Sequence, residues 1–185
     1  MKKLIRAGLF SSSLFLLALC CAPAVFAAAP ESALDITKLL FVSDVAGLSQ
    51  YTPKPEARFA IGDVCAIYVE TTGFAMEPVQ PGSEDEFNID LALDLEITMP
   101  QRRRTIASEK DFDSLKTTVR SKLPATFMAF SFIFDEDRNP GEYVITLTLR
   151  DNLSEQSVTR QMTYQLEKPT EADRARQAEE QSQAK

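Results

Sequence analysis

Apolar and polar residues alternate over residues 87–99, which is the clearest pattern in the chain. Apolar side chains occupy every second position from Phe87 to Met99, and the positions between them are mostly polar. A period of two places the apolar side chains on one face of a strand, whereas a helix would distribute them around its circumference. The pattern therefore predicts a long antiparallel strand with one buried face and one solvent-exposed face.

Shorter segments on either side of this strand show related patterns. Residues 64–70 are β-branched and aromatic, as expected of a half-buried strand, and residues 38–44 predict a shorter one. Residues 143–150 and 158–166 alternate like the two strands of a hairpin. About seven strands joined by turns predict an all-β protein, an antiparallel β-sandwich whose two sheets pack through their apolar faces.

Residues 108–123 break the alternation. Their apolar residues are spaced by three and four, at Phe112, Leu115, Val119 and Leu123. Asp111 or Asp113 could cap a helix here and Pro124 would end it. We therefore predict one short amphipathic helix that crosses between strands.

The strand predicted after this helix is apolar on both faces. It covers residues 126–134 and contains no charged residue before Asp135. Both of its faces need a cover, and we expect the helix to pack over Phe127 and Ile133. Otherwise these two side chains form an exposed patch of the kind that binds another protein.

An arginine run follows the long strand. If Ile106 lies opposite Ile97, residues 100–103 form the hairpin loop, and Arg102 and Arg103 lie at its exposed tip. The arginines could form a basic site for an anionic ligand or partner. We favour a solvated turn, whose charges also prevent edge-to-edge aggregation.

The first 29 residues have the layout of a secretory signal peptide. Basic residues precede an uninterrupted apolar run over residues 14–22, and small residues follow it. The run is shorter than the ~20 apolar residues that a membrane span requires, so we expect cleavage after Ala27 and no span thereafter. A lipid anchor on Cys20 or Cys21 is the alternative, although Leu19 occupies the position where a lipobox has a small residue.

These segments give the domain organisation and the compartment. We expect a periplasmic or secreted protein, which is divided into a signal peptide (1–27), a flexible lead-in (28–37), the sandwich domain (38–167) and a disordered charged tail (168–185). Only Cys65 remains after cleavage, so the exported domain has no internal disulfide and depends on a packed core.

The charge balance restricts the partners. The chain has a net charge of −7, and removing the three basic residues of the leader gives about −10. Nucleic acid and anionic lipid both require clustered basic residues, so neither is an expected partner.

One segment resembles the tyrosine corner of immunoglobulin-like and fibronectin type III-like domains. Gly141 and Tyr143 stand just inside a late strand, as in that motif. The resemblance implies that the Tyr143 hydroxyl bonds to upstream backbone and that the residue is structural. Immunoglobulin domains have a cysteine two positions later, but here it is Ile145, and the chain has no tryptophan. The disulfide form is therefore excluded, and we expect Cys65 to pack as a small apolar residue.

Catalytic patterns are missing from the sequence. It has no histidine, which removes the commonest general base and metal ligand. Its six glycines are dispersed singly and form no phosphate-binding loop. A glycosidase needs only two carboxylates, but sugar clefts are lined with stacking aromatics and the chain lacks tryptophan. We therefore expect a protein that is not an enzyme, with a carboxylate-dependent hydrolase as a remote alternative.

One metal-like pattern lies before the late hairpin. Asp135, Asp137 and Asn139 supply oxygen atoms at alternate positions, and Glu142 could add another. Pro140 stands where the calcium loop of a helix-loop-helix motif requires glycine, so the pattern also fits a polar turn. We predict no cofactor, with calcium as the possible exception.

Together these observations predict an exported, non-catalytic sandwich that binds a protein or is a structural component of the bacterial cell envelope. The alternative is a domain that binds calcium or a small ligand through the loop at residues 135–142.

Overall fold

The computed structural model describes residues 33–82, 84–133 and 138–176. Ten strands and one short 3-10 helix lie in these ranges. They are β1 (Asp35–Gly47), β2 (Gln50–Pro53), β3 (Arg58–Ala60), β4 (Val64–Thr72), β5 (Glu77–Pro78), β6 (Phe87–Met99), η1 (Pro100–Arg102), β7 (Arg104–Val119), β8 (Ala125–Ile133), β9 (Gly141–Asp151) and β10 (Ser157–Glu167).

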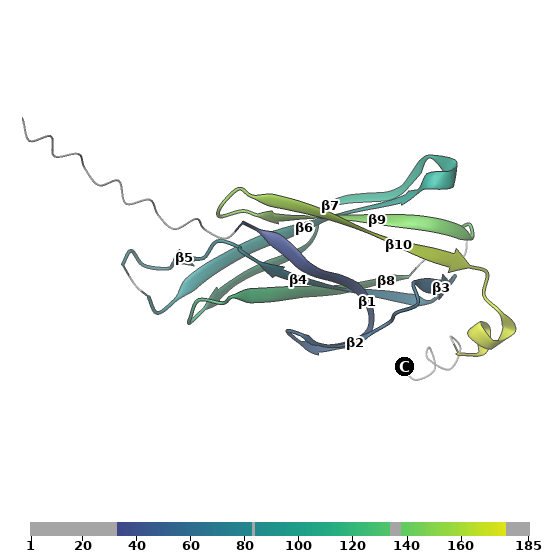
Figure 1. Ribbon diagram of the computed structural model, residues 1–185, viewed down its shortest axis with the longest axis horizontal. Helices are drawn as coiled ribbons and strands as arrows, with labels where there is room; N and C mark the ends of the chain where they lie inside the picture. The colour runs from purple at the N-terminus through teal and green to yellow at the C-terminus, as the bar shows by residue number, and fades with distance from the viewer. Residues whose placement is uncertain (1–32, 83, 134–137, 177–185) are drawn as a thin grey trace, which may run out of the picture.

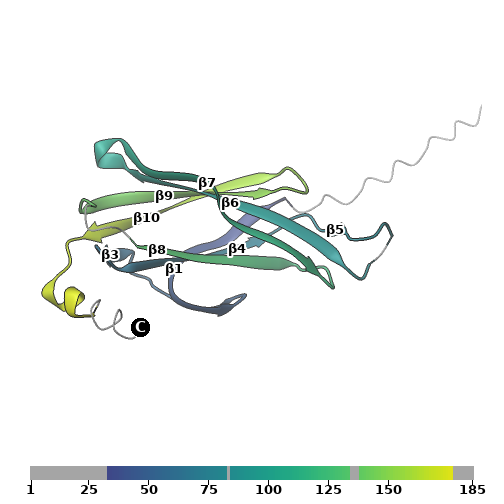
Figure 2. The same cartoon turned by 180° about the vertical axis from the view of Figure 1, so that it is seen from behind.

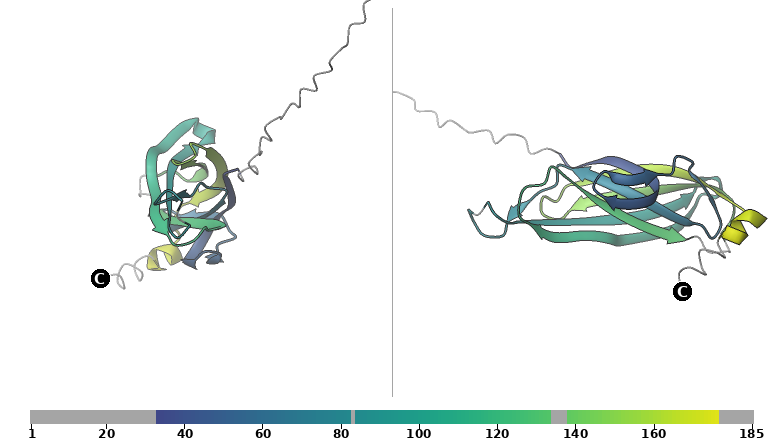
Figure 3. Two further views of the ribbon diagram at one scale, coloured as in Figure 1. Left: turned by 90° about the vertical axis from the view of Figure 1, so that its left-hand side faces the viewer. Right: turned by 90° about the horizontal axis from the view of Figure 1, so that it is seen from below.

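Two sheets pack face to face and form an elongated sandwich (Figures 1 and 2). The four-stranded sheet has the order β2-β1-β4-β8. The six-stranded sheet has the order β3-β10-β9-β6-β5, and β7 also pairs with β6. Every pairing is antiparallel except the short one between β3 and β10. The end-on view in Figure 3 shows the two layers, and the predicted all-β sandwich is confirmed.

The core lies between the sheets and follows the alternation of the sequence. Each apolar side chain from Phe87 to Met99 on β6 is at most 5% exposed. β9 contributes Ile145, Leu147 and Leu149, and β4 contributes the fully buried, free thiol of Cys65. Each buried leucine or isoleucine stabilises the fold by about 1.5–3 kcal/mol. These contacts hold the two sheets together in the described part of the chain, where Cys65 forms no disulfide.

The helix predicted for residues 108–123 does not form, because most of this segment belongs to β7. A bulge in β7 explains the misleading pattern. Asp113 pairs with Leu93 and Glu109 pairs with Leu95, so residues 110–112 lie opposite Asp94 alone. Asp111 adopts a left-handed conformation (φ 55°), and its N–H donates to Asp94 Oδ1 over 2.9 Å. The bulge interrupts the period of two, so Phe112, Leu115 and Val119 all contact the core from β7 despite their helical spacing.

At the ends of the sandwich, the observed strand bounds and register differ in detail from those that the sequence predicts. β1 begins at Asp35, inside the segment predicted to be a lead-in. Across the β6–β7 hairpin, Ile97 lies opposite Ala107, one position from the predicted register. Residues 171–176 are helical, and Arg176 Nη2 donates to Asp63 Oδ1 over 2.8 Å. The signal peptide and the last residues of the tail lie outside the described residues. No helix in the described ranges is long and apolar enough to cross a bilayer.

Candidate interaction surface

β8 is the edge strand of the four-stranded sheet. It pairs with β4 over nine consecutive residue pairs, and the ladder contains no bulge or register shift. Its sequence, ATFMAFSFI, contains no charge, proline or glycine. Edge strands with these properties are templates for pairing with another chain.

The other edges in the described part of the chain are protected. β2 and β3 are four and three residues long, and β5 is two residues long and ends in Pro78. β7 is long but carries charged side chains along its length and a bulge at residues 110–112. The part of β10 that β3 does not cover carries Arg160, which pairs with Asp35. Among the described strands, β8 is therefore the long edge that none of these devices blocks.

An apolar surface adjoins this edge on the outer face of the four-stranded sheet. Val64 and Ile133 lie directly opposite each other and are 51% and 59% exposed. Ala129, on the same face of β8, is also exposed. In the absence of the predicted helix, Ile133 is left in solvent. Phe127 is half-buried, because its ring stacks on the ring of Tyr68 with centroids 5.5 Å apart.

The outer end of the β1–β2 hairpin packs on the outer face of the same sheet, over Tyr68 of β4. The Tyr51 ring packs on Tyr68 with centroids 4.5 Å apart, and Ser49 donates its N–H to Tyr68 Oη over 2.8 Å. Tyr68 Oη and Ser49 Oγ both donate to Glu70 Oε2, over 2.9 and 2.8 Å. Lys38 Nζ completes the cluster, 3.0 Å from Glu70 Oε2. The cluster therefore joins the turn between β1 and β2 to the outer face of β4.

At neutral pH, Glu70 is ionised and Lys38 is protonated, so their ion pair can hold the end of the hairpin against the sheet. Burial raises the pKa of Glu70, but hydrogen bonds from Lys38, Ser49 and Tyr68 outweigh burial and hold this pKa below its usual value. The hydrogen bond to Glu70 raises the pKa of Lys38. Lys38 therefore stays protonated at neutral pH and does not act as a base toward Ser49.

The arginine run forms the tip of the hairpin between β6 and β7. η1 makes the turn, and Arg103 closes it in a left-handed conformation with φ 49°. Arg102 and Arg103 are exposed and make no ion pair with any described residue. Their hairpin belongs to the six-stranded sheet, whereas Phe127 and Ile133 belong to the other sheet. The structure therefore does not combine these four residues into one site.

The predicted calcium loop lies partly outside the described residues, which exclude Asp135 and Asp137. Asn139 and Glu142 are exposed, and the carbonyl of Asn139 accepts a hydrogen bond from Tyr143 Oη over 2.6 Å. This bond is the contact that the tyrosine-corner resemblance implies. No three acidic or cysteine residues in the described ranges are grouped to hold a metal ion. Calcium binding remains a prediction.

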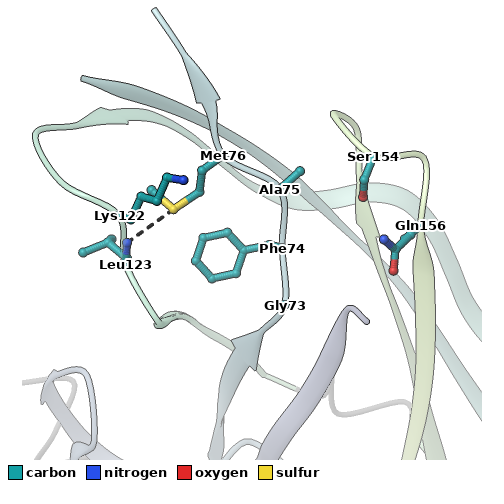
Figure 4. Close-up of a pocket in the computed structure, with 8 residues that line it drawn as sticks. All are labelled: Gly73, Phe74, Ala75, Met76, Lys122, Leu123, Ser154 and Gln156. Carbon is teal, nitrogen blue, oxygen red and sulfur yellow. Dashed lines mark hydrogen bonds between the residues drawn. The ribbon is translucent and has the colours of Figure 1, made fainter. Parts of the chain in front are cut away.

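A hollow of about 240 Å³ lies where β4 leads toward β5 (Figure 4). Phe74, Met76 and Leu123 line it together with Lys122, and the N–H of Leu123 donates to Met76 Sδ over 3.3 Å. Lys122 is the one charged side chain among its lining residues. The hollow therefore lacks the paired carboxylates that the hydrolase alternative requires.

Acidic residues do gather around another hollow, on the outer face of the six-stranded sheet. It measures about 270 Å³ and is lined by Asp94, Glu96 and Glu109 among others. Arg150 Nε and Nη2 donate to the two carboxylate oxygens of Asp94 over 3.1 and 3.0 Å. This hydrogen bonding lowers the pKa of Asp94, whereas a glycosidase needs a general acid with a raised pKa.

Comparisons with known proteins found distant structural likenesses. No family model and no curated protein matches the chain. Similar solved structures include the C-terminal domain of Wzt, with 10% identity, a TM-score of 0.44 and coverage of 75% of both chains. The alkylpurine DNA glycosylase AlkC of Pseudomonas fluorescens, bound to DNA with an abasic site analog, has 12% identity, a TM-score of 0.43 and coverage of 76% of this chain and 31% of its own. An immunoglobulin-like protein from Pseudomonas aeruginosa has 11% identity, a TM-score of 0.36 and coverage of 75% of this chain and 100% of its own.

The described part of the chain is a β-sandwich of a four-stranded and a six-stranded sheet.

Proposed function

We propose that this chain is an exported, non-catalytic β-sandwich of the bacterial cell envelope that binds another polypeptide by adding a strand to β8. The observation that carries the proposal is the regular, uncharged and unprotected edge of β8. Export is supported by the first 29 residues, whose charge and apolar pattern match a signal peptide.

Strand addition uses two kinds of interaction. Main-chain hydrogen bonds along the added strand supply affinity, and alternate side chains supply specificity. The exposed side chains of Val64, Ala129 and Ile133 lie on one face beside this edge, so they would contact the added strand or the segments next to it. The expected partner segment is extended and apolar, because an unpaired charge would lose solvation against this surface.

Site-specific photo-crosslinking tests the proposal. A benzoylphenylalanine is introduced in place of Ser131 on β8 in cells that produce the protein, and in place of Thr163 on β10 as a matched exposed control. We expect a covalent adduct with a polypeptide from position 131, its loss when Ala129→Lys is added, and no adduct from position 163. Equal adducts from both positions, or none from position 131, would refute binding at this edge.

A further inference from the structure

The sequence of β8 indicates which polypeptide it binds. We infer that the added strand is the β8 of a second copy of this chain, antiparallel to the first and centred on Ala129. This inference rests on the proposed function, since both require the edge of β8 to be open. It makes the four-stranded sheets of two copies continuous across a two-fold axis.

The strand is complementary to itself in this register. Ala129 faces Ala129 of the second copy, Phe127 faces Ser131, and Ala125 faces Ile133. Each of these pairs places a small side chain opposite another side chain on the exposed face, so bulky groups do not collide across the axis. The exposed Ile133 gains a neighbour in the second copy, and no charge enters the paired region.

The charges that flank β8 favour the antiparallel direction. Arg120 and Lys122 precede the strand in the sequence and give this flank a net charge of +2, whereas residues 135–138 follow it with three acids and one arginine, a net charge of −2. Antiparallel pairing brings the start of one strand beside the end of the other, so flanks of opposite net charge approach at both ends. Parallel pairing would bring like charges together and is therefore disfavoured.

The net charge of the chain also makes β8 the suitable place for contact between copies. Two molecules that each have a net charge of about −10, once the predicted leader is removed, repel each other over most of their surfaces. Residues 123–134 are uncharged, and within the sequence only the predicted leader has a longer uncharged run.

Sedimentation velocity with charge-swapped variants tests the inference. The protein purified from producing cells is compared with Ala129→Lys, Ala129→Glu, an equal mixture of the two, and Thr163→Lys as the matched control. Residue 129 is exposed, so neither substitution should disturb the fold of one copy, and circular dichroism checks this. Lys opposite Lys, or Glu opposite Glu, should weaken the dimer roughly tenfold, whereas Lys opposite Glu should restore it.

The expected result is a concentration-dependent dimer for the wild type and Thr163→Lys, predominantly monomer for each charged variant alone, and dimer for their mixture. Hydrogen exchange over residues 125–133 should slow as the wild-type concentration rises. A wild type that stays monomeric at high concentration, or an Ala129→Lys variant that dimerises like the wild type, would overturn the inference. If the wild type is monomeric but position 131 still crosslinks to a different protein, self-pairing fails while the proposed function stands; if neither occurs, both fail.

Discussion

Ile133 at the end of β8 lies directly opposite Val64 at the start of β4, and both side chains remain about half exposed. Neighbouring β-branched residues on one face of a sheet usually gain stability by being covered. Here the pair contacts solvent, although the next residue after Val64, Cys65, and the residue before Ile133, Phe132, contact the core. The pair therefore contributes little to the stability of a single copy.

Replacing Ile133 with threonine tests this conclusion. Threonine keeps the β-branch, so the free energy of unfolding of the monomer should change by less than about 0.5 kcal/mol. Leu147→Ala, in the core, should instead cost about 2–5 kcal/mol. Urea unfolding at low protein concentration measures both values. A large loss for Ile133→Thr would mean that this side chain supports the fold.

The Glu70 cluster predicts an acid-sensitive contribution to stability. The pKa of Glu70 is lowered in the folded protein, so its stabilising effect is fully present above the ordinary value of 4.5. The effect is lost as the pH falls through the lowered, folded-state pKa. Glu70→Gln should therefore lower the melting temperature at pH 7, and its difference from the wild type should shrink toward zero in acid. A difference that stays constant from neutral pH to about pH 2 would contradict this account.

Gly141 is expected to resist substitution. Its φ is 150°, and a Cβ on this residue would lie 2.5 Å from Cε of Met99. Gly141→Ala should cost about 1–3 kcal/mol in the free energy of unfolding. Gly82→Ala is a comparison without a contact, because no atom lies within 4 Å of the added Cβ there and its φ of 79° imposes a milder strain.

A double-mutant cycle with Met99→Ala separates the clash at Gly141 from the strain. Removing the Met99 side chain should reduce the cost of Gly141→Ala, since the colliding methyl group is then absent. Equal costs in both backgrounds would show that the clash plays no part.

Cys65 should be inert in the folded protein. Its side chain is fully buried, and burial raises the pKa of the thiol to about 12. A thiol reagent needs an accessible thiolate, so the peptide that contains Cys65 should be labelled only as fast as the protein unfolds. Mass spectrometry of digested samples distinguishes it from the cysteines near the N-terminus. Rapid labelling without denaturant would contradict the burial.

The sequence predicts a strand correctly where the alternation of apolar and polar residues continues without interruption. β6 could be predicted because its alternation continues over thirteen residues and depends only on the strand having one buried face. β7 could not, because the bulge at Asp111 shifts the phase and produces the spacing of a helix. Such a bulge is specified by contacts far away in sequence: Arg150 on β9 binds Asp94, which in turn accepts from the N–H of Asp111.

The candidate surface was only partly predictable for a similar reason. The uncharged composition of β8 is visible in the sequence, and Phe127 and Ile133 could be singled out from it. That β8 is an edge strand, with Val64 beside Ile133, depends on the order of strands in the sheet. The cluster around Glu70 was missed because it joins Ser49, in a turn, to residues on β1 and β4.

Polar and aromatic contacts hold the outer end of the β1–β2 hairpin against β4. Its tip contacts Tyr68 and Glu70 on the outside of the sheet, whereas the sandwich is held together by side chains between the layers. The tip can therefore detach while the layers stay closed, a subglobal opening that requires less free energy than complete unfolding. Detachment would expose the ring of Tyr68 next to Phe127. The exposed apolar surface beside β8 would then grow, while the core between the sheets stayed intact.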